Sequence, residues 1–374
     1  MPGIYIHIPF CKKACYYCDF HFSTSQKNKQ EMVDALIKEI QQRKDYLPDK
    51  KIQSIYFGGG TPSLLSATQI HSVLNEIQKH FILSENCEIT LEANPDDLSI
   101  SKLKELKNCG INRLSIGVQS FFDEDLKYLN RSHSAKNALE SIQIAQQEGF
   151  ENITIDFIYG FPLLSTKKWK QNIQKALELK IPHISAYSLT TEKGTALHHF
   201  ISKGKYAALN EETAVKHFRI LCKMLKTESF EHYEISNFAL PGFYSAHNTS
   251  YWQQKNYLGV GPSAHSFNGT SRQWNVANNI QYIKKINTHQ PFFEKEQLSE
   301  ATHYNEYILT SFRTMWGVEK KYLQKKFANF LPLFTKQKEK YLTEKYLTEN
   351  QTRIVLTEKG KLFADQIASD FFIV

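Results

Sequence analysis

Three cysteines near the start of the chain form the pattern with the clearest chemical meaning. Cys11, Cys15 and Cys18 follow the spacing C-x3-C-x2-C directly behind the stretch IYIHIPF, and the whole chain holds six cysteines. In a reducing compartment, closely spaced cysteines are metal ligands or redox catalysts far more often than disulfide partners. We therefore expect these three thiols to bind a metal centre.

Two kinds of metal centre fit the triplet. A structural zinc site normally has four protein ligands, so His7, Asp19 or His21 would have to supply the fourth. A 4Fe-4S cluster held by three thiolates instead leaves one iron open to a substrate or cofactor. A triplet of merely buried thiols is a further alternative, which the charged Lys12 and Lys13 inside the triplet disfavour. The spacing favours the cluster.

Length and composition bound the rest of the molecule. The 374 residues, with 41% hydrophobic and 13% aromatic content, are enough for one large domain and a smaller one. No secretory signal and no long apolar run is apparent, so we expect a cytoplasmic protein, able to associate peripherally with the inner membrane. The net charge of +8 favours anionic partners without choosing among nucleic acid, carboxylate-rich ligands and a membrane surface.

Short β-branched and aromatic runs alternate with longer segments of helical periodicity, a pattern typical of βα units around a parallel sheet. The predicted strands are Ile4–Ile8, Ile52–Phe57, Glu88–Ala93, Arg113–Val118, Ile153–Ile158 and His183–Leu189. Between them, apolar residues over 135–145 predict a helix ending near Gly149, and Ser99 and Gly110 bracket another. The sequence thus predicts an α/β fold, a partial or complete (β/α) barrel with its chemistry at the carboxyl ends of the strands.

Beyond about Leu189 the βα repeat fades, and aromatic and Gly-rich loops continue to about residue 290. From Glu294 the sequence is helical and lysine-rich, and RIVLTEKGKLFADQIASDFF reads as a short strand, a turn and a helix. We predict two domains, a barrel with its extension over residues 1–290 and a small, mostly helical domain of winged-helix type over 291–374. No long linker separates them, so they should pack together.

The cysteine spacing, with the aromatic Tyr17 before the last cysteine, resembles that of the radical S-adenosylmethionine enzymes. More narrowly, YIHIPFCxxxCxYCDF followed by GGGTP resembles the branch that contains oxygen-independent coproporphyrinogen III oxidase. The resemblance implies a 4Fe-4S cluster on Cys11, Cys15 and Cys18. It also implies S-adenosylmethionine, chelated to the open iron through its amino and carboxylate groups and cleaved to a 5′-deoxyadenosyl radical.

Other positions gain a role from the same resemblance. A glycine run after a strand lets backbone groups approach a ligand closely, and acids at successive strand ends are costly to bury without a partner. The alternative to ligand binding is that the glycine run is an ordinary turn at the end of a strand and that the acids form ion pairs at the surface. The resemblance implies that S-adenosylmethionine is bound by Tyr5, Tyr17, Gly59, Gly60, Thr61, Glu92, Gln119, Arg131 and Asp156.

Two departures separate the chain from the oxidases. Phe20 stands where they carry a further cysteine, and little sequence precedes Tyr5. In the stretch SAHNTSYW, a second motif of His247, Asn248, Tyr251 and Trp252 resembles the HNxxYW pattern of the heme chaperones in this branch. Imidazole is a good axial ligand for heme iron, and aromatic rings pack on a porphyrin face. The alternative is a hydrogen-bonded loop core around the histidine, and His265 is a weaker second candidate ligand.

These features predict a heme chaperone that carries a 4Fe-4S cluster, S-adenosylmethionine and heme. We expect it to pass heme to an acceptor apo-protein, such as a respiratory cytochrome at the membrane, and to receive electrons from a separate donor. The alternative is an oxygen-independent coproporphyrinogen III oxidase, which decarboxylates two propionate side chains. Radical chemistry on RNA is a third class, but interleaved basic and aromatic residues are lacking, so no nucleic acid partner is expected. We interpret Cys87, Cys109 and Cys222 as packed small hydrophobic residues.

Overall fold

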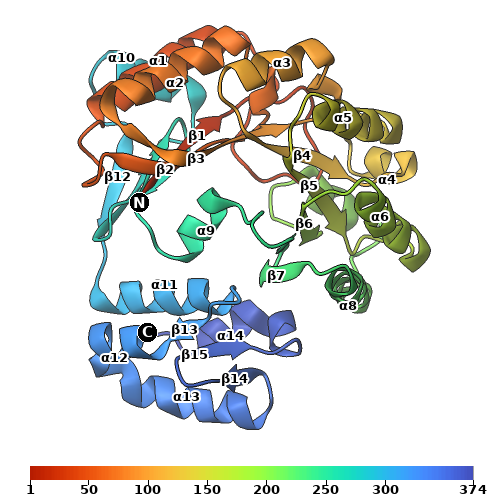
Figure 1. The fold of residues 1–374 in the computed structure, drawn as a ribbon, viewed down its shortest axis with the longest axis vertical. Helices are drawn as coiled ribbons and strands as arrows, with labels where there is room; N and C mark the ends of the chain where they lie inside the picture. Colours follow the sequence, from red (N-terminus) through yellow and green to blue (C-terminus); the bar gives the residue numbers. More distant parts are fainter. Residues whose placement is uncertain (374) are drawn as a thin grey trace.

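The computed structural model describes residues 1–373 and contains six consecutive βα units. Their parallel strands lie side by side in chain order and form the centre of the sheet (Figure 1). All six strands lie where the sequence predicts them, which confirms the α/β fold. They are β1 (Gly3–Ile8), β2 (Lys51–Gly59), β3 (Ile82–Ala93), β4 (Arg113–Gln119), β5 (Asn152–Tyr159) and β6 (His183–Ser188).

Helices cover the outer face of this sheet and bury their apolar stripes against it. Serine N-caps begin four of them, because each hydroxyl accepts a hydrogen bond from a backbone N–H of the first turn. The two helices predicted from the sequence are confirmed, including the positive φ of +79° at Gly149. The helices are α1 (Lys29–Gln42), α2 (Ala67–His80), α3 (Ile100–Asn108), α4 (Asp123–Tyr128), α5 (Ala135–Gln147) and α6 (Thr166–Glu178), with 3₁₀ turns η1 (Pro62–Leu64) and η2 (Pro95–Asp97).

The chain after β6 extends the sheet at both edges. On one side β9 (Tyr257–Val260) pairs in parallel with β1, and the antiparallel strands β10 (His265–Phe267), β11 (Ser271–Asn275) and β12 (Phe293–Gln297) follow. On the other side β8 (Asn237–Ala239) and β7 (Glu231–Glu234) pair next to β6. The helices of this part are α7 (Ala196–Ser202), α8 (Glu211–Thr227), α9 (Ala246–Trp252) and α10 (Asn279–Asn287).

A second, smaller core lies in the C-terminal part, around a three-stranded antiparallel sheet. The predicted division after residue 290 stays a prediction; residues 293–297 nevertheless pair with the large sheet through β11. The elements of this part are α11 (Glu300–Phe312), β13 (Val318–Glu319), α12 (Lys320–Lys326), η3 (Ala328–Phe330), α13 (Leu331–Thr343), β14 (Leu347–Glu349), β15 (Arg353–Leu356), η4 (Gly360–Phe363) and α14 (Ala364–Asp370).

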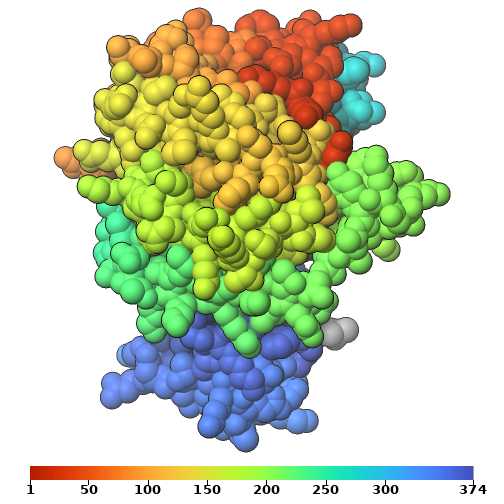
Figure 2. Space-filling view, turned by 90° about the vertical axis from the view of Figure 1, so that its right-hand side faces the viewer, coloured from red at the N-terminus to blue at the C-terminus, as the bar shows by residue number. Residues whose placement is uncertain are grey.

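The two parts meet along the end of β7, and Figure 2 shows the C-terminal part, in blue, packed against the green segment. The backbone N–H of Ile235 donates to the carbonyl of Arg313 at 3.0 Å, and that of Met315 donates to Tyr233 at 3.0 Å. The guanidinium of Arg313 also donates to the buried carboxylate of Glu234 at 3.0 Å. A second ion pair, between Arg272 on β11 and Glu306 on α11, also crosses the junction. Backbone pairing and ion pairs thus join the two cores.

Within residues 1–373, no helix has both the length and the apolar character that crossing a bilayer requires.

Candidate functional site

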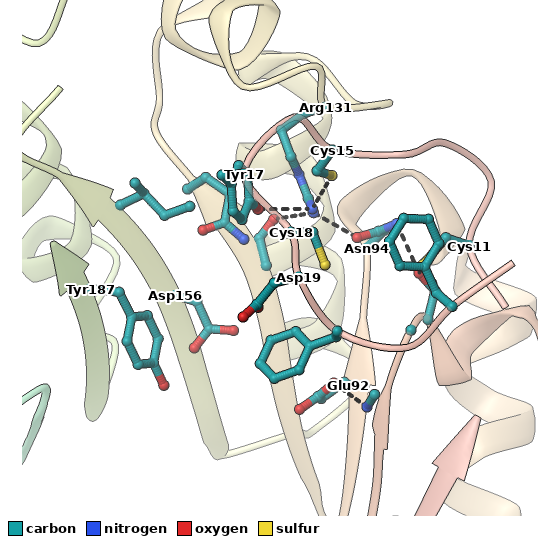
Figure 3. A pocket seen from close by; sticks show the side chains of 18 of the residues that line it. Cys11, Cys15, Tyr17, Cys18, Asp19, Glu92, Asn94, Arg131, Asp156 and Tyr187 are labelled. Atoms are coloured by element: carbon teal, nitrogen blue, oxygen red, sulfur yellow. Dashed lines mark hydrogen bonds between the residues drawn. The ribbon is translucent and has the colours of Figure 1, made fainter. Parts of the chain in front are cut away.

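A cavity of about 420 Å³ opens at the carboxyl ends of the parallel strands, and we call it the cluster cavity. All three cysteines of the triplet line it, and Figure 3 shows their side chains around its mouth. Eight of the residues that the resemblance assigned to S-adenosylmethionine line it as well. They are Tyr17, Gly59, Gly60, Thr61, Glu92, Gln119, Arg131 and Asp156.

The cysteines lie on a loop that follows β1 and is closed on itself by backbone hydrogen bonds. The N–H of Cys11 donates to Ser23 at 3.0 Å, and the N–H of Ser23 donates to Pro9 at 2.9 Å. Burial raises the pKa of the Cys11 thiol, and it raises that of Cys18 to about 11. Such thiols lose their protons when a metal ion supplies positive charge. Together with Cys15, these two residues bring three thiols to one cavity, which fits a metal cluster.

Arg131 fixes one side of the cysteine loop. Its Nη1 donates to the Sγ of Cys15 at 3.3 Å and to the hydroxyl of Tyr17 at 3.5 Å. Its Nη2 donates to the Oδ1 of Asn94 at 2.6 Å and to the carbonyl of Gly117 at 3.0 Å (Figure 3). A buried guanidinium therefore stands beside a predicted ligand sulfur and ties it to the ends of β3 and β4.

The glycine run at the end of β2 forms the opposite wall, where space is tight. A Cβ on Gly60 would lie 2.6 Å from the carbonyl oxygen of Phe10, the residue before Cys11. Gly59 has a φ of +104°, which L side chains rarely adopt, and its N–H donates to Glu92 at 3.1 Å. Tyr56 donates to the other oxygen of Glu92 at 2.8 Å. Only glycine lets this loop lie so close to the cysteine loop.

Two half-buried carboxyl groups, those of Glu92 and Asp156, lie in the cavity at strand ends. Burial raises the pKa of Glu92 to about 7 and that of Asp156 to about 6. A raised pKa indicates that few neighbouring groups stabilise the negative charge of the carboxylate. A ligand with a positive charge or with hydroxyl groups would stabilise that charge. Gln119, also in the lining, has a φ of 63°, a strained backbone of the kind found at ligand sites. The cavity therefore suits a polar ligand with an amino group or sugar hydroxyls.

The remaining predicted residues lie outside the cluster cavity. The hydroxyl of Tyr5 lies 3.1 Å from Nδ1 of His7, beneath the cavity lining. His247 is fully buried, with Nδ1 2.8 Å from the hydroxyl of Ser54 and Nε2 2.8 Å from the hydroxyl of Tyr251. Both ring nitrogens of this histidine are thus engaged by other side chains.

The HNxxYW motif forms α9, which fills the barrel on the side of the amino ends of the strands. Glu88 on β3 accepts hydrogen bonds from the first backbone N–H groups of the helix, at 2.8 Å from Ala246 and 3.0 Å from His247. The His247 ring stacks on Tyr56 with centroids 5.1 Å apart. Trp252, at the last position of the helix, faces the C-terminal part instead, where Arg313 lies 5.2 Å from its ring.

Several residues of the cluster cavity were not singled out by sequence reasoning. Asn94 follows β3 and holds Arg131, and Ser115 on β4 donates to Asp156 at 3.3 Å. Tyr187, near the end of β6, also lines the cavity. Only their position in the sequence could have identified these residues as part of the site. Each lies at or just after a predicted strand, on the side that faces the barrel interior.

Comparison with known proteins identifies the family. Residues 5–176 match the model of the Radical SAM superfamily. The chain is 34% identical to the heme chaperone HemW of Lactococcus lactis, over 99% of this chain and 97% of that protein, and 35% identical to that of Bacillus subtilis, over 99% of each. The solved structure of coproporphyrinogen III oxidase (HemN) from Escherichia coli superposes with a TM-score of 0.85, covering 99% of this chain and 90% of that one. Its 22% identity supports the fold alone. The chain belongs to the HemW family of radical SAM proteins.

Proposed function

We propose that this protein is a heme chaperone, which binds heme and delivers it to acceptor proteins. The observation that carries the proposal is the similarity to proteins named heme chaperones over 99% of the chain. An acceptor such as a respiratory cytochrome at the membrane fits this role, and the net charge of +8 suits both heme propionates and an anionic membrane surface.

The cluster cavity would hold a 4Fe-4S cluster on Cys11, Cys15 and Cys18, with S-adenosylmethionine beside it. When bound, the cluster supplies single electrons, which a separate donor protein must replace. Arg131 orients Cys15 and places a positive charge beside the thiolates. The backbone from Gly59 to Thr61 offers hydrogen-bonding groups to the methionine part, and Glu92 offers its carboxylate.

The HNxxYW motif contributes to heme binding in this proposal. Direct ligation by His247 would require breaking its hydrogen bond to Ser54 or to Tyr251, because both ring nitrogens are engaged. Trp252 needs no such rearrangement, because its indole is only half-buried at the surface of α9.

The test is an anaerobic hemin titration of the cluster-reconstituted protein, followed through the Soret band. We expect saturable binding with defined stoichiometry, and transfer of the heme to an apo-cytochrome that is faster than transfer from free hemin. Serum albumin loaded with hemin serves as the nonspecific control. Failure to bind above a nonspecific level, together with conversion of coproporphyrinogen III to protoporphyrinogen in anaerobic reactions, would instead identify an oxidase.

A further inference from the structure

A cleft of about 870 Å³ lies between the barrel and the C-terminal part, and we call it the interdomain cleft. One wall consists of Trp252 at the end of α9, the residues after it up to Lys255, Phe267 and the turn after β10. The other wall consists of α11, the segment 314–319 and α12. Its volume is near the upper end of the range for small-molecule sites, roughly 300–1,000 Å³, so it suits a large ligand.

Aromatic side chains from both walls line the cleft. Trp252 comes from α9, and Tyr307, Trp316 and Tyr322 come from the C-terminal part. The rings of Tyr307 and Tyr322 pack with their centroids 4.8 Å apart. Flat rings on two walls suit a large planar aromatic ligand, which can stack between them.

One histidine, His303, lies among these rings. It shares a face of α11 with Tyr307 and Ser311, at spacings of four and eight residues, and all three line the cleft. Its imidazole is half-buried, with the Phe267 ring 6.3 Å away, and it makes no hydrogen bond with any residue from 1 to 373. In contrast to His247, this imidazole can ligate a metal without losing an existing hydrogen bond.

Cationic groups surround the same cleft. Lys255 and Lys326 are exposed in the lining, and neither ammonium group forms an ion pair with a carboxylate among residues 1–373. Arg353 also lines the cleft while its Nη1 donates to the carbonyl of Trp316. Glu300 and Glu319 also lie in the lining, so the cleft as a whole is not strongly positive. The unpaired positive charge is confined to the two lysines. Two free ammonium groups in one cleft can each pair with a carboxylate of a dianionic ligand such as a porphyrin with two propionates.

We propose that the interdomain cleft is the heme site, with His303 as axial ligand, Trp252 stacked on the macrocycle, and Lys255 and Lys326 on the propionates. This inference rests on the proposed chaperone function and deepens it. In this arrangement the HNxxYW motif acts through Trp252, while His247 and Tyr251 anchor the helix that presents it.

The experiment is a hemin titration of the full-length, cluster-reconstituted protein with His303→Ala, His247→Ala and His199→Ala variants. His199, exposed on α7 and remote from the cleft lining, is the matched helix-borne control. We expect His303→Ala to weaken hemin binding about tenfold or more and to shift the Soret maximum. Added imidazole should restore the wild-type spectrum, because it replaces the missing ligand. His199→Ala should match the wild type.

The outcomes separate the two proposals. If the wild type itself shows no saturable binding, the chaperone function fails, and the heme site fails with it. If the wild type binds and His303→Ala binds equally, with an unchanged spectrum, the cleft assignment alone is overturned. Spectral rescue by imidazole in His247→Ala but not in His303→Ala would also overturn it, because the ligand would then be His247.

Discussion

The cluster cavity and the interdomain cleft differ in how their side chains are held. In the cluster cavity, Arg131 alone makes four hydrogen bonds, and Glu92 accepts from Gly59 and Tyr56. In the cleft, the imidazole of His303 makes no hydrogen bond with residues 1–373, and only the backbone N–H of this residue donates, to Ser299 within the helix. The cavity is built from the ends of neighbouring strands, the cleft from two separate cores. A site on one sheet is therefore organised before its ligand arrives, whereas a site between two cores keeps its ligand groups free.

The largest effect is expected from removal of a predicted cluster ligand. Cys15→Ala should abolish iron and acid-labile sulfide binding, because the remaining two thiols cannot hold the cluster. Saturable hemin binding should persist, because the cleft shares no lining residue with the cavity. Iron and sulfide analysis beside a hemin titration measures both. Cys109→Ala, a half-buried thiol outside the cavity, is the control. Complete loss of hemin binding in Cys15→Ala would contradict the assignment of heme to a separate site.

Gly60→Ala tests the close approach of the glycine and cysteine loops. The added Cβ would meet backbone atoms of Phe10 and Ile8 at 2.6 and 2.8 Å, so the cysteine loop must shift. We expect the iron content after reconstitution to fall to a minor fraction of the wild-type value. Gly110→Ala, at φ +91° in open space, should cost about 1 kcal/mol of stability without affecting iron. Equal iron loss in both variants would mean that stability, not the loop contact, is responsible.

Arg313→Ala tests an ion pair that joins the barrel to the C-terminal part. It leaves the buried carboxylate of Glu234 without its cation, so the free energy of unfolding should fall by about 3 kcal/mol. Urea titration measures this loss. Asp365→Asn removes only the exposed partner of the same guanidinium and should change stability by less than about 0.5 kcal/mol. Similar losses in the two variants would show that the ion pair with Glu234 contributes no more to the free energy of unfolding than the exposed pair with Asp365 does.

The pH dependence of stability tests the environment of Glu92 in the cluster cavity. The pKa of Glu92 is raised by burial from 4.5 to about 7, so the ligand-free folded state keeps a proton that the unfolded state has lost. The free energy of unfolding should therefore fall as pH rises from 4.5 to about 7, by about 3 kcal/mol from this group. Glu92→Gln should flatten the urea-derived pH profile, because a glutamine side chain has no carboxyl group to titrate. An unchanged slope in Glu92→Gln would assign the dependence to other groups.

Much of the fold could be predicted from the sequence because its signals are local. Apolar periodicity and capping residues lie within each βα unit, so the six strands, the helix after Ser99 and the helix over 135–145 were predictable. The parallel pairing of β9 with β1 was not predictable, because it joins residues about 250 positions apart through a four-residue strand. Local patterns do not encode such long-range pairing.

The candidate sites divide in the same way. The residue types and spacing of the three cysteines and of GGGTP predict the cluster cavity. Eight of the nine residues predicted to bind S-adenosylmethionine line it. Tyr5 lies on the predicted strand, but its hydroxyl group points to His7, beneath the cavity lining. His303 carried no motif, since it is one polar residue on an amphipathic helix. Its significance appears only when α11 is placed opposite α9.

One side chain, Tyr56, spans the two ends of the barrel interior. Its hydroxyl donates to Glu92 in the cluster cavity, and its ring stacks on His247, which anchors the helix that ends in Trp252. A ligand of the cluster cavity that drew Glu92 away from Tyr56 would free this ring to shift against His247, beneath α9. If S-adenosylmethionine and heme bind at the two proposed sites, thermodynamic reciprocity requires that each change the other's affinity by the same factor. Cooperativity of this kind would set the order in which the protein loads its two ligands and releases its cargo.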